Sequence, residues 1–187
     1  MADASDTLQQ VTVALTIGDK SLAKSVLADS YPFVPQSKAK RSYTPQQSLE
    51  VFARDGFIDR YTGQRLVYPS VLYAVAAELP KSFPFGGGRN KSHRAHWELF
   101  PTVDHLVPVS RGGPDEMQNW VTTSMTTNMV KSSCTLEELG WELHPAGNLA
   151  EWDGLCSWYL EYATGHDYLA SVQSNKGWHH AITRKFA

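Results

Sequence analysis

Hydrophobic residues recur three or four positions apart in the first part of the chain, and this spacing predicts helices. Two short helices are expected over 8–15 and 21–27. Pro32 and Pro35 end the second, because proline cannot continue a helix. The polar stretch that follows reads as a linker. Residues 1–43 are therefore expected to form an N-terminal helical segment and linker.

Proline and glycine divide the rest of the chain into further helices. One is expected to begin at Thr44-Pro45, with threonine as the N-cap and proline at the first position, and to end at Asp55-Gly56. Another is expected over 69–79, after a tight turn. Near the end of the chain, apolar spacing predicts helices over 136–139, 152–162 and 172–186.

The middle of the chain, from 104 to 131, reads DHLVPVSRGGPDEMQNWVTTSMTTNMVK. A proline and a glycine pair break its first strand into a loop, because proline lacks a donor and glycine accepts positive φ. A short apolar return strand follows over 119–121, and Thr122-Thr123 is the expected N-cap of a helix over 124–131. The predicted order is strand, loop, strand, helix.

These elements predict an α+β fold, in which several helices surround a small core made of a β-hairpin and a helix. That core is expected over 44–145, with a C-terminal helical segment over 146–187 packed on it. A chain of 187 residues with 42% hydrophobic content can bury a sizeable core in one domain with an appendage.

The charge of the chain bears on its partners. The formal net charge of −2 counts against a general nucleic-acid coat. The distribution of charge partly offsets this, because Lys81, Arg89, Lys91 and Arg94 lie together without an acid around three glycines. Two further basic groups lie at 38–41 and 179–185. If these groups converge, one side of the protein could face DNA.

Cysteine usage and hydropathy bear on the compartment. The two cysteines, Cys134 and Cys156, could pair, but a chain without a signal-like apolar run is more simply interpreted as cytoplasmic with free thiols. No apolar run approaches the ~20 residues of a membrane span, so no membrane association is expected.

Asp104 and His105 are the first candidates for chemistry, because adjacent side chains on a strand point to opposite faces. One could face a metal ion and the other a water molecule. Asn128 would lie near the end of the following helix, aimed back at the hairpin. Taken alone, the Asp-His pair would more simply be a hydrogen-bonded strand end.

The 104–131 segment resembles the HNH nuclease motif of the ββα-metal endonucleases. His105, Asn119 and Asn128 fall at the intervals of its first histidine, middle asparagine and last position, in the version that ends in asparagine. Asp104 and Lys131 match that version too, so five positions agree in type and interval. A looser resemblance to bacterial HNH-like proteins covers roughly residues 50 to 160.

The resemblance implies a role for each matching residue. His105 would be the general base, because an imidazole with a pKa of ~6.5 can take a proton from water near neutral pH. Asn119 would fix the hairpin loop and orient His105. Lys131 would hold the scissile phosphate or its neighbour. Asp104 and Asn128 would ligate the cation, and this all-oxygen pair suits Mg²⁺ or Mn²⁺.

Many such nucleases carry a structural zinc ion held by two Cys-x-x-Cys pairs. The corresponding positions in this chain are Asp59, Thr62, Ser124 and Thr127, and none of them supplies a thiolate. No structural zinc is therefore expected. A hydrogen-bonded and apolar brace is expected in its place, with Tyr61, Leu66 and Trp120 filling the space.

The resemblance implies a DNA endonuclease that hydrolyses phosphodiester bonds with one Mg²⁺ or Mn²⁺ ion, of the restriction or defence type, acting on double-stranded DNA. The candidate DNA contacts are Arg89, Lys91, Arg94, Arg111 and Lys131, although Arg111 could equally be a solvated loop charge. Cutting both strands would favour a homodimer. The alternatives are an indiscriminate toxin-type nuclease and a non-catalytic DNA-binding protein on the same frame.

Overall fold

The computed structural model describes residues 3–33 and 43–186 and divides the chain into two compact units, Met1–Lys40 and Arg41–Ala187. The basic group at 38–41 and most of the expected linker lie outside the described residues. Within the described ranges, no helix combines the length and the apolar character that a membrane crossing requires.

The N-terminal unit is a pair of helices, α1 (Ala4–Thr16) and α2 (Lys20–Ser30). Each begins at an aspartate that caps its first turn, since Asp3 accepts a hydrogen bond from the amide of Ser5 and Asp19 accepts one from Leu22. Alanine, valine and leucine side chains fill the contact between the helices. Both predicted helices are confirmed, and each is a few residues longer than the sequence pattern indicated.

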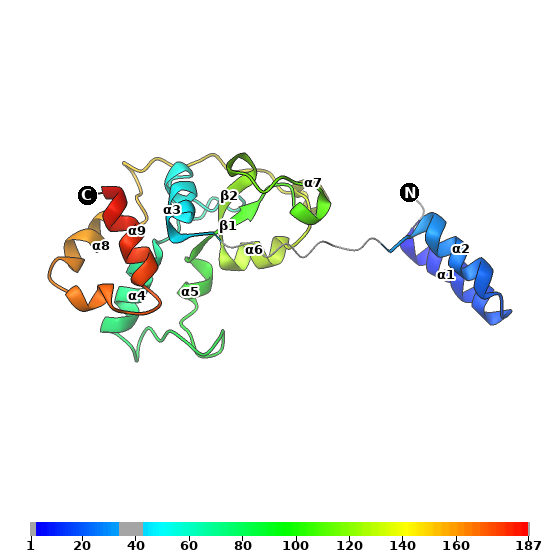
Figure 1. Ribbon diagram of the computed structural model, residues 1–187, viewed down its shortest axis with the longest axis horizontal. Helices are drawn as coiled ribbons and strands as arrows, with labels where there is room; N and C mark the ends of the chain where they lie inside the picture. Colours follow the sequence, from blue (N-terminus) through cyan, green and yellow to red (C-terminus); the bar gives the residue numbers. More distant parts are fainter. Residues whose placement is uncertain (1–2, 34–42, 187) are drawn as a thin grey trace. The chain divides into compact units, whose positions relative to one another are not determined.

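The centre of the second unit is a two-stranded antiparallel sheet followed by a helix (Figure 1). Strand β1 (Pro101–His105) pairs with β2 (Trp120–Ser124), and α6 (Met125–Lys131) follows directly. We call these three elements the hairpin-helix centre. The α+β class and the order strand, loop, strand, helix are therefore confirmed.

The junction between β2 and α6 differs from the prediction. The N-cap of α6 is Ser124, whose side chain accepts a hydrogen bond from the amide of Thr127, and not the pair Thr122-Thr123. Those two threonines belong to β2, where they are buried. Because β-branched residues suit a strand, the strand extends to the last residue that can cap the helix.

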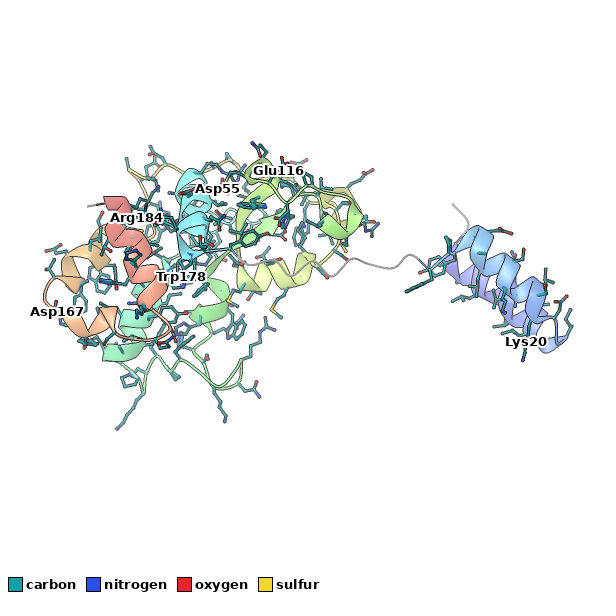
Figure 2. The ribbon with its side chains drawn as sticks, viewed as in Figure 1. Lys20, Asp55, Glu116, Asp167, Trp178 and Arg184 are labelled. Atoms are coloured by element: carbon teal, nitrogen blue, oxygen red, sulfur yellow. The ribbon has the colours of Figure 1, made fainter. Side chains whose placement is uncertain are left out.

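Helix α3 (Pro45–Arg54) connects the hairpin-helix centre to the rest of the unit. Thr44 is its N-cap and Pro45 its first residue, as expected, and Gln47 completes a capping box with Thr44. Asp55, labelled in Figure 2, lies buried at its end and accepts a hydrogen bond from the amide of Thr122 in β2. The two atoms are 2.7 Å apart. On its other side, Phe52 stacks on Trp178 of α9 (Lys176–Phe186), with ring centroids 6.1 Å apart.

The remaining helices are α4 (Pro69–Glu78), α5 (Ala95–Glu98), α7 (Leu136–Leu139) and α8 (Cys156–Ala163), with single 3₁₀ turns at Val109–Arg111, Met117–Asn119 and Asp167–Ala170. The predicted helix over 152–162 begins too early. Gly154 and Leu155 adopt left-handed φ angles of 69° and 64°, so the helix cannot start before Cys156. A side chain at Gly154 would collide with the ring of Phe57.

Candidate functional site

His105 lies at the end of β1, buried against Trp120, its partner across the sheet. Its Nε2 atom lies 2.8 Å from Oδ1 of Asp115, a residue of the loop between the two strands. The same carboxylate oxygen accepts hydrogen bonds from the Tyr43 hydroxyl (3.1 Å) and from Nε1 of Trp120 (2.9 Å). The imidazole is therefore fixed by one carboxylate, which is itself fixed by two other donors.

The charge state of Asp115 sets the tautomer of His105. Hydrogen bonding from His105, followed by bonds from Trp120 and Tyr43, lowers the pKa of the Asp115 carboxyl below its ordinary value. An ionised carboxylate only accepts hydrogen bonds, so Nε2 of His105 must carry the hydrogen between them. Nδ1 then keeps its lone pair. That nitrogen has no hydrogen-bond partner among the described residues and is not enclosed.

Asp104 points to the opposite face of β1, as alternation along a strand requires. Its Oδ2 atom accepts a hydrogen bond from the Tyr61 hydroxyl (2.7 Å) and lies 2.9 Å from Nζ of Lys131. Burial, and then the negative charge of Asp104, raises the pKa of the Tyr61 hydroxyl, so this group remains a donor. This is a carboxylate neutralised within the protein.

Lys131 does not occupy the position expected of a phosphate ligand. Its side chain is fully buried at the end of α6, where Nζ also donates to the backbone carbonyl of His105 (2.8 Å) and lies over the ring of Tyr61. The expected direct contact with a phosphate does not fit this placement. Lys131 instead ties α6 to β1, and it neutralises Asp104.

Asn119 ends the loop between the strands and holds it closed. Its side-chain oxygen accepts a hydrogen bond from the amide of Val107, and its Nδ2 donates to the carbonyls of Val107 (2.9 Å) and Pro114 (2.8 Å). Its expected role in fixing the loop agrees with these bonds. It makes no bond to His105, and the orienting contact comes from Asp115 instead.

Asn128 lies on α6, partly exposed, and its carboxamide makes no hydrogen bond to another described residue. Asp104 has one oxygen, Oδ1, outside its bonds to Tyr61 and Lys131. Carboxylate and carboxamide oxygens fit a hard cation, and Mg²⁺ commonly takes one or two protein ligands and several waters. Within residues 3–33 and 43–186, no group of three or more His, Cys, Asp or Glu could hold a metal ion.

The four positions that correspond to zinc-binding cysteines are largely joined by hydrogen bonds. Asp59 is fully buried, with Oδ1 accepting from the Thr123 hydroxyl and the Tyr61 amide, and Oδ2 from the Ser124 amide (2.9 Å). Ser124 in turn bonds to Thr127 through its hydroxyl. Thr62 caps only its own turn, through the amide of Gln64. We call this cluster, without Thr62, the Asp59 brace.

The expected apolar fillers Tyr61, Leu66 and Trp120 are all buried.

The candidate DNA contacts fall into two groups. Arg111 is half exposed and pairs with Glu138 of α7 (3.1 Å), so its charge is already balanced on the surface. Arg89, Lys91 and Arg94 belong to the long connection between α4 and α5, and Arg94 is the N-cap of α5. The structure does not place Arg111 with them.

Two residues of the site, Tyr43 and Asp115, were missed in the sequence, and Tyr61 was expected as an apolar filler but not as a donor to Asp104. Asp115 had a detectable signal, because it is an acid in the loop that Asn119 closes, ten positions after the candidate base. The two tyrosines had none, since they lie 62 and 43 positions from the residues they contact.

Comparison with protein-family models, with curated proteins and with solved structures gave no significant match.

Proposed function

We propose that the chain is a DNA endonuclease of the ββα-metal (HNH) type, which hydrolyses phosphodiester bonds with the help of one divalent cation. One observation carries the proposal. An imidazole fixed by a carboxylate stands at the end of β1, within a strand, loop, strand and helix that have the spacing of the HNH motif. A protein that only binds DNA has no use for such a base.

His105 acts as the general base. With the hydrogen held on Nε2 by Asp115, the Nδ1 lone pair takes a proton from a water molecule. The oxygen of that water attacks the phosphorus, and the bond from phosphorus to the 3′ oxygen breaks. The leaving oxygen takes a proton from solvent, and the product carries a 5′ phosphate. The proton on His105 then returns to solvent.

Asp104 and Asn128 would hold the cation, Mg²⁺ or Mn²⁺, through their side-chain oxygens. When bound, it neutralises the charge that develops on the phosphate oxygens. Asn119 keeps the loop closed, so that Asp115 stays opposite His105.

The decisive experiment compares His105→Ala with His144→Ala, which removes an exposed histidine outside the hairpin and outside the basic groups. We expect His105→Ala to lower the single-turnover cleavage rate by at least about 100-fold, because it removes the general base. DNA affinity without metal should stay the same, and His144→Ala should behave as the wild type. Near-normal cleavage by His105→Ala would remove the base assignment.

The substrate panel comprises plasmid, single-stranded, branched and methylated DNA, each incubated with Mg²⁺ or Mn²⁺ before the ends are sequenced. Cleavage at defined sites in duplex DNA is the expected result. Degradation of every substrate without preference would indicate the toxin-type alternative. Binding without cleavage by the wild type would indicate the non-catalytic alternative, and would end the proposal.

A further inference from the structure

A hollow of about 430 Å³ lies between α5 and α6, beside the hairpin-helix centre. We call it the α5–α6 hollow. The two helices are joined at its floor, where the Thr126 hydroxyl donates to the backbone carbonyl of Trp97 (3.0 Å). Its lining is mostly polar and charged: Arg89, Ser92, Arg94, Trp97, Glu98 and Thr126.

Arg89 is the unbalanced charge of this hollow. Its guanidinium lies 5.3 Å from the centre of the Trp97 ring, and Nη2 lies 3.6 Å from the sulfur of Met129 on α6. Neither partner is an anion, and no carboxylate pairs with Arg89 in the described part of the chain. Arg94, by contrast, is neutralised by Glu98 at 2.6 Å.

The connection that carries Arg89 is anchored on both sides of the residue. The ring of Phe83 stacks on His93, with centroids 4.4 Å apart, and the amide of His93 donates to the carbonyl of Pro84 (2.7 Å). Phe85 packs against the buried His96 of α5. Arg89 therefore projects from a loop whose two ends are anchored. Its guanidinium also contacts the Trp97 ring and the Met129 sulfur, so it is partly ordered before any ligand binds.

The hollow and the candidate cation site share one helix. Thr126 and Met129 are three positions apart on α6 and so lie on one face, toward the hollow. Asn128 is the neighbour of Met129, about 100° around the helix. Arg89 contacts Met129, the chain neighbour of Asn128, so a DNA strand with one phosphate at Asn128 could bring a neighbouring phosphate of the same strand toward Arg89.

We infer that the α5–α6 hollow binds a backbone phosphate of the DNA strand, next to the phosphate that is cleaved, through the guanidinium of Arg89. The inference rests on the proposed function. A planar guanidinium matches two phosphate oxygens, and Trp97 holds its plane in place. Arg89 thereby takes over the phosphate contact that buried Lys131 cannot make.

The test measures DNA affinity of the full chain in EDTA, so that binding is separated from cleavage. The variants are Arg89→Met and the control Arg65→Met. Arg65 also lies over a tryptophan ring, that of Trp152 at 5.2 Å, but it does not line the hollow. For Arg89→Met we expect the slope of log affinity against log salt to become shallower by about 0.9, which corresponds to one lost phosphate contact in duplex DNA. Arg65→Met should keep the wild-type slope.

A second measurement locates the phosphate. Single methylphosphonate groups, which are neutral, are placed at each position around the cleaved bond. One position should weaken wild-type binding about ten-fold and have no effect on Arg89→Met, because the two changes remove the same contact. An abasic nucleotide at that position should have little effect.

The outcomes separate the two proposals. A wild-type salt slope in Arg89→Met, or equal changes in Arg89→Met and Arg65→Met, would overturn the phosphate site while leaving the nuclease intact. Sensitivity to the abasic nucleotide but to no methylphosphonate would overturn it in favour of a base contact. If the wild type neither binds nor cuts DNA, the proposed function fails, and the phosphate site fails with it.

Discussion

Asp104 and His105 are neighbours on one strand, yet their surroundings differ. Each contacts one tyrosine and one residue of opposite charge type. Asp104 contacts Tyr61 and the basic Lys131. His105 contacts Tyr43 and the acidic Asp115. On the Asp104 side, the ammonium of Lys131 is fully buried. On the His105 side, the side chain of Asp115 is 48% exposed.

The two pairs differ in the burial of their charged partners, and so they should contribute differently to stability and to turnover. A buried charge that loses its partner is costly, so the fold keeps Lys131 paired with Asp104. The Asp115 carboxylate can exchange with water, so it can fix His105 without adding much to stability. Changes on the Asp104 side should therefore lower stability as well as weaken the proposed cation site, whereas changes on the His105 side should lower turnover with little loss of stability.

The largest effect is expected from Lys131→Met, which removes the ammonium and keeps most of the apolar stem. Asp104 is then left without its counter-charge, and the free energy of unfolding should fall by about 3 kcal/mol. Urea denaturation in EDTA measures this. Lys91→Met, at an exposed lysine, should change it by less than about 0.5 kcal/mol.

The double variant Asp104→Asn with Lys131→Met tests whether the loss arises from the pair. It removes both charges, so part of the lost stability should return. A loss below about 1 kcal/mol in Lys131→Met alone would mean that the pair is not a buried structural link.

Asp115→Asn should act in the opposite way. The carboxamide cannot hold the Nε2 hydrogen of His105 as a charged acceptor does, so kcat should fall by about 10- to 100-fold while KM stays nearly constant. Stability should change little, because the side chain is half exposed. The matched control is Glu116→Gln, at the neighbouring exposed acid (Figure 2), which should leave both quantities unchanged.

A fall in KM and kcat together, or a loss of stability as large as that of Lys131→Met, would contradict this role for Asp115. Rescue by Asp115→Glu would support it, since the longer acid keeps an acceptor of the same charge.

The smallest effect is expected when the pH is lowered and the stability of the wild type is compared with that of Asp115→Asn. The folded protein holds the pKa of Asp115 below its ordinary value of 3.8. A carboxyl whose pKa is lowered by folding stabilises the folded protein fully at a pH above its ordinary pKa. This stabilisation is lost as the pH falls through the lowered pKa. The wild type should therefore be slightly more stable than Asp115→Asn at about pH 6, and the difference should vanish toward about pH 3. Urea midpoints across this range measure it, and a constant difference would contradict the assignment.

Much of the fold could be predicted because its signals are local. The Thr44-Pro45 start of α3, the prolines after α2 and the glycine pair before Asn119 each lie within a few residues of the element they define. The order of the hairpin-helix centre follows from the same kind of signal.

The rest depends on contacts between distant parts of the chain. The late start of α8 follows from the left-handed φ angles of Gly154 and Leu155. The close packing of Gly154 against Phe57, almost a hundred positions earlier in the chain, is a contact that the sequence pattern does not give. Helix α5 has four residues and was not predicted, because so short a helix has too few positions to show a period. Lys131 was assigned to a phosphate because a sequence gives a charge but not its burial.

The Asp59 brace has a consequence for the conditions under which the protein keeps its shape. Carboxylates, hydroxyls and backbone amides do not oxidise under conditions that convert thiolates to disulfides, and a chelator has nothing to remove from a bond between Asp59 and Ser124. The tie between the 59–62 turn and α6 should therefore be insensitive to oxidants and to metal starvation. Under the proposed function, a protein depleted of its divalent ion would stop cleaving DNA but would keep its fold, and cleavage would resume when the ion is restored.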